Sequence, residues 1–115
     1  MAKTRDLGKD AETRAETLLR RSGLRPIARN YRCRAGEIDL IMRDGEHLVF
    51  VEVRLRSHPG YGGALSSVGT HKQQRLILAA RHYLMSSGWQ GPCRFDVVGF
   101  DRGGDATWIS DAFSA

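Results

Sequence analysis

Two runs of β-forming residues with a short Asp-Gly turn between them constrain the fold of this chain more than any other feature. The runs cover residues 37–42 and 48–54, and residues 43–46 separate them. An Asp-Gly pair between two such runs is the strongest short-range signal for a β-hairpin with a two-residue turn. The sequence therefore predicts two adjacent antiparallel strands near the middle of the chain.

Helices and further strands are expected on both sides of this hairpin. The predicted elements are a helix at 6–21, an irregular or extended piece at 24–30, the hairpin, a glycine-rich loop at 57–69, a helix at 70–86, and strands at 94–100 and 106–109. They follow from apolar spacing and from the glycine-containing breaks between segments. The order α-β-β-α-β-β predicts an α/β fold, with a central mixed β-sheet flanked by helices. The strands on either side of the second helix should be parallel.

Length, charge and apolar content narrow the classes of function. The 115 residues suffice for one domain, 1–115, with one core. The net charge of +5 favours a polyanionic partner such as nucleic acid, although charge alone is a weak indication. No run approaches the ~20 apolar residues of a membrane span, and the first residues lack a signal peptide's apolar stretch, so a cytoplasmic protein without a membrane partner is expected. Cys33 and Cys93 lie far apart, which predicts reduced thiols and no zinc site.

The turn decides which residues of the hairpin lie opposite one another. If residues 44 and 45 form the turn, Asp39 is expected opposite Phe50, and Glu37 opposite Glu52. Asp39 and Glu52 then become diagonal neighbours on one face of the hairpin. Arg54 follows Glu52 by two residues and should point to the same side.

Two acidic side chains on one partly apolar face need a physical reason. Carboxylates in such a place repel each other and are costly to desolvate, and a hard cation such as Mg²⁺ or Mn²⁺ removes this conflict. The ion would activate a water and neutralise charge on a phosphodiester. The alternative is a solvated face on which Arg54 forms ion pairs with Glu52, and spacing alone does not separate the two interpretations.

One further glutamate and several basic residues are candidates for the same site. Glu12 lies at the margin of the first helix's apolar stripe and is a candidate third ligand, although a helix-surface glutamate is usually just solvated. Lys72 and Arg75 occupy the opening turns of the second helix, where they oppose the helix dipole. This placement indicates either a bound phosphate or an ordinary basic face. A second basic cluster consists of Arg29, Arg32 and Arg34 around Tyr31.

Four ordered segments, at residues 30–34, 36–41, 48–54 and 94–98, carry a family resemblance. Together they resemble the YraN family of bacterial proteins over nearly the whole chain, from about residue 8 to residue 113. That family is similar to the archaeal Holliday-junction resolvases and belongs to the PD-(D/E)XK nuclease superfamily. The resemblance therefore implies a restriction-endonuclease-like core, a divalent metal ion and a nucleic-acid substrate.

The resemblance also assigns roles to the candidate residues. The implied catalytic residues are Asp39, Glu52 and Arg54, the implied metal ligands are Asp39, Glu52 and Glu12, and the implied nucleic-acid contacts are Arg29, Arg32, Arg34, Lys72 and Arg75. Two positions depart from the family pattern. Arg54 stands where most relatives have lysine, and it keeps the charge but cannot act as a neutral amine. Ala11 stands where relatives usually have glycine, which a helix tolerates easily.

Three functions are compatible with these features. The first is a Mg²⁺- or Mn²⁺-dependent endonuclease that acts on DNA, with branched or single-stranded DNA as candidate substrates. The second is a non-catalytic nucleic-acid-binding module that kept the nuclease scaffold. The third is a protein-interaction domain in a recombination or DNA-uptake assembly. A homodimer would suit a two-fold junction, by analogy with the family alone. The sequence favours the endonuclease.

Overall fold

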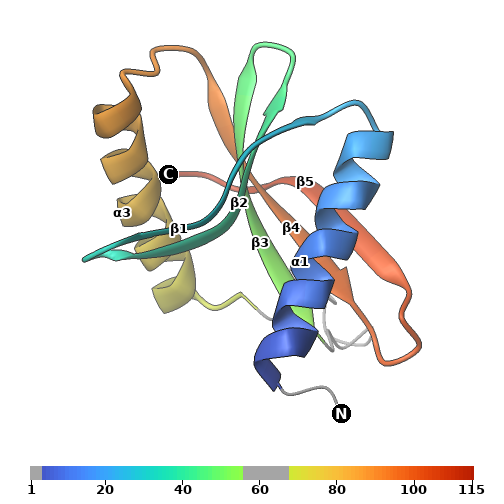
Figure 1. The fold of residues 1–115 in the computed structure, drawn as a ribbon. Coiled ribbons are helices and arrows are strands. Elements are labelled where there is room, and N and C mark those ends of the chain that lie inside the picture. The colour runs from blue at the N-terminus through green and yellow to red at the C-terminus, as the bar shows by residue number, and fades with distance from the viewer. Residues whose placement is uncertain (1–3, 56–67) are drawn as a thin grey trace.

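A five-stranded mixed sheet lies between two helices in the computed structural model, which describes residues 4–55 and 68–115 (Figure 1). The elements are α1 (Thr4–Arg21), β1 (Arg25–Cys33), β2 (Gly36–Asp44), β3 (His47–Leu55), α3 (Thr70–Ser87), β4 (Cys93–Phe100) and β5 (Ala106–Phe113). The strands are ordered β1-β2-β3-β4-β5 across the sheet, and β3 and β4 are parallel. The predicted α/β class, with a mixed sheet flanked by helices, is confirmed.

The element order differs from the prediction by one strand, because β1 forms where an irregular or extended piece was expected. The order is therefore α-β-β-β-α-β-β among the described residues. Pro26 explains the error, because proline lacks the N–H of a ladder hydrogen bond and argues against a strand. In the structure, β1 is an edge strand, and its pairing with β2 shifts between Pro26 and Ala28. The predicted loop at 57–69 lies almost entirely outside the described residues.

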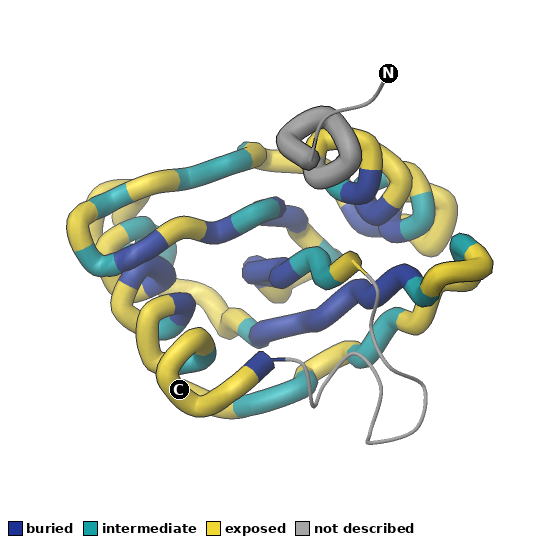
Figure 2. Tube along the Cα trace, turned by 90° about the horizontal axis from the view of Figure 1, so that it is seen from below, coloured by how far each residue is buried: buried dark blue, intermediate teal, exposed yellow. Residues whose placement is uncertain are grey.

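Each helix covers one face of the sheet, which therefore has two apolar layers. Under α1, the buried residues include Ala15, Leu19 and strand residues such as Val49. Under α3, they include Leu76 and Phe50. Figure 2 shows the buried stretches of the central strands lying between the two helices. In the described part of the chain, neither helix has the length and apolar content to cross a bilayer.

The predicted hairpin forms as β2 and β3, but its register was wrong by two residues. Asp44 pairs with His47, so the turn consists of residues 45 and 46 instead of 44 and 45. Gly45 has φ of +58°, and glycine adopts this left-handed conformation at the first turn position without steric cost. The ladder continues as far as Leu40 opposite Val51. Extending it by one step places Asp39 opposite Glu52, where Phe50 had been expected.

The strand alternation breaks beside Asp39. Asn30 of β1 has φ of +53° and lies opposite Asp39, between two regular pairs of the β1–β2 ladder. Ile38 and Ile41 both pack on the α3 side, although they are three residues apart, while Leu40 packs on the α1 side. A regular strand would place Ile38 and Leu40 on one face, so the alternation is interrupted between them. Figure 1 shows β2 turning away from β3 beyond the hairpin ladder. Since the last pair of that ladder is Leu40 with Val51, Asp39 lies where the two strands diverge.

A buried aspartate ties β4 to β5. The Asp96 carboxylate accepts hydrogen bonds from Arg94 (Nε to Oδ1, 3.0 Å; Nη2 to Oδ2, 3.2 Å), from Trp108 Nε1 (2.9 Å) and from the Asp111 backbone N–H (2.9 Å). Arg94 also donates to Asp44 Oδ2 at 2.9 Å. Because both Asp96 oxygens are fully hydrogen-bonded, this buried charge is compensated.

Candidate functional site

Asp39 and Glu52 form a carboxyl pair at the divergence of β2 and β3. Asp39 Oδ2 accepts a hydrogen bond of 2.8 Å from the Val53 backbone N–H, which fixes the aspartate against β3. The Glu52 side chain is only 3% exposed, and its Oε2 lies 3.3 Å from Lys72 Nζ of α3. The Glu52 carboxyl group lies close enough to Asp39 to raise the pKa of the aspartate. The structure thus brings together the two residues that the sequence placed on one face.

The electrostatics of this pair are unfavourable without a cation. Burial raises the pKa of Asp39 from 3.8 to about 8, and the hydrogen bond and negative charge of Glu52 act in the same direction. The Val53 N–H and the Lys72 ammonium oppose this rise in pKa but do not cancel it. The metal-free pair therefore retains a proton at neutral pH.

Glu12 of α1 lies beside Asp39 without completing a three-carboxylate cluster. Burial and the negative charge of Asp39 raise the Glu12 pKa, while a hydrogen bond with Asn30 and the charge of Arg29 lower it. Across residues 4–55 and 68–115, no three His, Cys, Asp or Glu side chains converge closely enough to hold a metal ion. The structure therefore brings two of the three predicted ligands together and leaves Glu12 as a neighbour.

The carboxyl pair fits a divalent cation on two grounds. Among the buried side-chain oxygens in the described segments, Glu52 Oε2 and Glu12 Oε1 take part in no hydrogen bond, so each keeps capacity to bind a positive group. Mg²⁺ prefers carboxylate oxygens and is commonly held by one or two of them, with waters and substrate phosphates completing its coordination. Asp39 and Glu52 would supply such a donor set.

Two predicted phosphate contacts line a small pocket next to this pair. Lys72 lies in the first turn of α3, and Arg75 follows it by one turn, where its Nε donates to the Ala35 carbonyl oxygen at 3.4 Å. Gly36 permits this close approach of α3, because a Cβ there would lie 3.0 Å from the Arg75 carbonyl oxygen. A pocket of about 180 Å³ is lined by Glu37, Lys72, Arg75 and Leu76. The α3 N-terminus has no side-chain cap, so its N–H groups add to the positive potential.

The predicted basic cluster of β1 is divided by the structure. Arg32 is 75% exposed and pairs with Glu37 at 3.5 Å, and Arg34 is exposed in the β1–β2 turn. Both therefore lie at the hairpin tip that approaches α3. Arg29 instead contacts α1, through Glu12 and Thr13. Arg54, the predicted catalytic cation, is half-buried on β3, two residues beyond Glu52.

No role was predicted for Asn30, which lies opposite Asp39 on the β1–β2 ladder. A signal was present, because asparagine is one of the few residues that readily adopt a left-handed conformation inside an extended segment. Asn30 stands between Arg29 and Tyr31 in a segment of otherwise extended residues. Its position could have marked the break in strand alternation.

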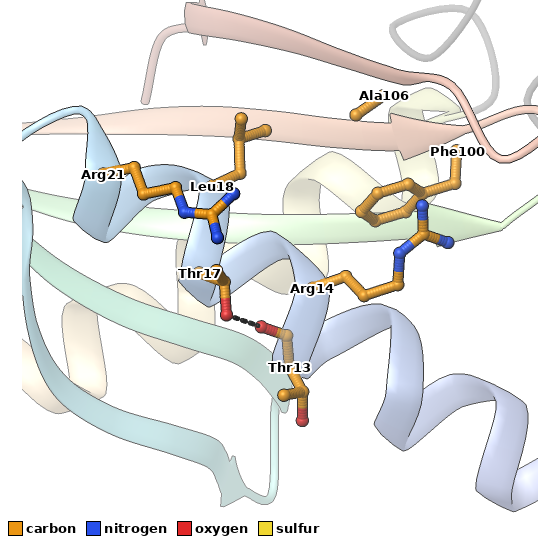
Figure 3. Close-up of a pocket in the computed structure, with 7 residues that line it drawn as sticks. All are labelled: Thr13, Arg14, Thr17, Leu18, Arg21, Phe100 and Ala106. Carbon is orange, nitrogen blue, oxygen red and sulfur yellow. Dashed lines mark hydrogen bonds between the residues drawn. The ribbon is translucent and has the colours of Figure 1, made fainter.

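A larger groove of about 300 Å³ lies between α1 and the β4–β5 end of the sheet (Figure 3). Its lining residues are Thr13, Arg14, Thr17, Leu18, Arg21, Phe100 and Ala106. Arg14 stacks over the Phe100 ring at 4.5 Å and donates to the Gly104 carbonyl oxygen at 2.7 Å, so it holds the β4–β5 turn against α1. Arg21 lies in the last turn of α1, where a positive charge stabilises the helix. None of the described residues that line the groove is acidic, and Asp39 and Glu52 are not among them.

Comparison with known proteins gives a consistent family relationship. The sequence model of the uncharacterised protein family UPF0102 matches residues 11–100. A UPF0102 protein of Methylobacillus flagellatus is 54% identical over 113 residues, which cover 96% of this chain and 99% of the relative. A UPF0102 protein of Stutzerimonas stutzeri is 48% identical over the full length of both chains. A UPF0102 protein of Hahella chejuensis is 49% identical, with 99% of this chain and 94% of the relative covered.

Proposed function

This chain belongs to the uncharacterised protein family UPF0102, which its YraN-like motifs predicted, and we propose that it is a cytoplasmic metal-dependent endonuclease that cleaves DNA phosphodiesters. The single observation that supports this most is the position of Asp39 beside the buried Glu52, where burial and Glu52 together raise the pKa of Asp39 to about 8. Folding alone gives no reason to place two acidic groups together in a largely buried site, because two negative charges there repel each other and are costly to desolvate. The strand order is also consistent with a nuclease-like core. Branched or single-stranded DNA is the substrate class that the family resemblance implies.

Each residue of the site has a role in this proposal. Asp39 and Glu52 would hold Mg²⁺ or Mn²⁺, and such an ion supplies charge neutralisation at the phosphodiester and a water of lowered pKa. The Val53 N–H keeps the Asp39 carboxylate in place. Lys72 stabilises the ionised form of Asp39 and lies close enough to Glu52 to pair with it. Arg54 would stabilise charge that develops on the phosphate, and Lys72 with Arg75 would orient the backbone.

The proposal is tested by incubating the protein with labelled single-stranded, duplex, flap and four-way DNAs. We expect products only when Mg²⁺ or Mn²⁺ is present, and none after chelation. Glu46→Gln is the matched control for carboxylate substitutions at the site, because Glu46 is an exposed glutamate in the turn of the same hairpin. The Glu46→Gln protein should cleave DNA as the wild type does. Nicking that is unchanged by chelation, or a protein that binds neither DNA nor a divalent ion, contradicts the proposal.

A second function, a non-catalytic nucleic-acid-binding module, is favoured by one observation. Arg54 stands at the superfamily's lysine position, and arginine cannot take a role that needs a neutral amine. A binding module should show an affinity that falls steeply with added salt, without a metal requirement and without products. The basic residues near α3 would serve either function.

Arg54→Lys separates the two functions. If the protein is an enzyme slowed by arginine, we expect this change to raise the cleavage rate by about tenfold, which corresponds to ~1.4 kcal/mol of transition-state stabilisation. Initial rates on the best substrate of the panel measure the effect. Arg102→Lys in the exposed β4–β5 turn is the control and should change nothing. An Arg54→Lys protein that binds DNA in a salt-dependent manner but yields no product favours the binding module.

A further inference from the structure

We infer that Arg29 is a positioning residue for Glu12, which it holds beside the Asp39–Glu52 pair, and that Arg29 makes no contact with nucleic acid. This inference rests on the proposed function, because a positioned Glu12 matters only if the pair binds a cation. It reassigns Arg29, which the sequence had grouped with Arg32 and Arg34. The contacts of Arg29 with α1 give the first argument.

One nitrogen of Arg29 lies close to three oxygen atoms of α1, which belong to Lys9, Glu12 and Thr13. Its Nη2 donates to Thr13 Oγ1 at 3.2 Å and to the Lys9 carbonyl oxygen at 3.4 Å, and it lies 3.7 Å from Glu12 Oε1. Arg29 is thus directed at a single turn of the helix. Its side chain is 34% exposed, against 75% for Arg32 on the same strand. A guanidinium held in this way has less freedom to reach a phosphate.

The backbone places this contact next to the candidate metal ligands. Arg29 pairs with Leu40, the residue after Asp39 on β2. The next residue of β1, Asn30, has the left-handed φ of +53° and lies opposite Asp39 on the β1–β2 ladder. Arg29 therefore contacts Glu12 next to the point where β2 diverges from β3.

The ion pair with Arg29 fixes the position of the Glu12 carboxyl group and leaves its Oε1 without a hydrogen bond. Glu12 Oε1 is buried and forms no hydrogen bond, because 3.7 Å from Arg29 is too long for one. Arg29 therefore holds Glu12 beside the pair with one buried oxygen free of hydrogen bonds, where that oxygen can contact a cation or one of its waters.

Two measurements on Arg29→Gln test this role. A lost phosphate contact lowers the slope of log affinity against log salt by about 0.9, so Arg29→Gln should leave that slope unchanged. The matched control, Arg32→Gln on the same strand, should lower it. Calorimetric titration with Mn²⁺ alone should show affinity weakened by about tenfold in Arg29→Gln, as expected when an orienting residue is lost. Arg29→Lys should recover part of it.

The result in a Glu12→Gln background distinguishes positioning from a general electrostatic effect. If Arg29 acts through Glu12, adding Arg29→Gln to Glu12→Gln causes no further loss of Mn²⁺ affinity. A lower salt slope, an additive loss, or tighter Mn²⁺ binding in Arg29→Gln overturns the inference, and the last would show that Arg29 only repels the ion. If neither Arg29→Gln nor Asp39→Asn changes Mn²⁺ binding, the proposed function fails together with the inference. If Asp39→Asn abolishes Mn²⁺ binding and Arg29→Gln leaves it unchanged, only the inference about Arg29 fails.

Discussion

Asp39→Asn is expected to abolish metal-dependent cleavage while it makes the metal-free protein more stable at alkaline pH. The variant removes one of two carboxylates that would hold the ion, and the loss of several kcal/mol of charge stabilisation corresponds to a rate decrease of about a thousandfold. Asparagine is nearly isosteric, and its side-chain oxygen can still accept the hydrogen bond from Val53. The expected gain in stability comes from the titration of the aspartate.

The direction of the pH effect follows from the raised pKa of Asp39. The folded state keeps a proton on Asp39 up to a pKa of about 8, whereas an unperturbed aspartate loses it near 3.8. Between these values the native state binds more protons, so the free energy of unfolding falls by roughly 1.4 kcal/mol per pH unit as the pH rises. The Asp39→Asn protein does not lose stability in this way, because asparagine does not titrate. Its free energy of unfolding should therefore exceed that of the wild type only slightly near pH 4, by more as the pH rises, and by a constant amount above about pH 8.

Urea unfolding at several pH values, with and without Mn²⁺, measures this effect. Asp10→Asn is the control, because it makes the same chemical change at an exposed position of α1. Added Mn²⁺ should stabilise the wild type and not Asp39→Asn, because a ligand stabilises only the state that binds it. Parallel pH profiles for the wild type and Asp39→Asn would show that Asp39 is not held protonated by the fold.

The site could be predicted from the sequence to the extent that it depended on which face a residue occupies. The Asp-Gly signal predicted the hairpin correctly but placed the turn one residue too early, since glycine takes the left-handed first position of the turn and leaves Asp44 outside it. The resulting shift was two residues. Because strand side chains alternate with period two, an even shift changes partners and preserves faces. Asp39 and Glu52 therefore remained together.

The rest of the site depended on contacts between distant segments, which a single sequence does not specify. Arg29 was grouped with its neighbours along β1, but its orientation is set by α1 packing over that strand and by the left-handed backbone at Asn30. Pro26 hid the edge strand itself, because only an edge position tolerates the missing N–H. Sequence periodicity carries no information on either point.

Asp96→Ala is expected to cause a large loss of stability. The Asp96 carboxylate is fully buried and accepts four hydrogen bonds, of which two come from Arg94, one from Trp108 and one from Asp111. Its removal leaves the mostly buried Arg94 charge partly unpaired, which typically costs about 3–5 kcal/mol. Urea or guanidinium unfolding measures the change. Asp44→Ala, which removes only the half-exposed partner of Arg94, should cost about 1 kcal/mol or less.

The double change Arg94→Met with Asp96→Leu tests whether the loss comes from the unpaired charge or from the other bonds. Replacing both members of a buried ion pair by apolar residues often restores stability, because no charge is left uncompensated. Here the recovery should be partial, since the Trp108 and Asp111 N–H groups still lose their acceptor, at about 1–3 kcal/mol for each group that stays buried. Full recovery would show that the Trp108 and Asp111 hydrogen bonds contribute little to stability. No recovery would show that the Arg94–Asp96 ion pair contributes little and that the loss comes from those two hydrogen bonds. Strand β4 is parallel to β3, and Asp96 pairs with Val51 while Val97 pairs with Glu52. An intact Asp96 network therefore also supports β3, the strand that carries Glu52.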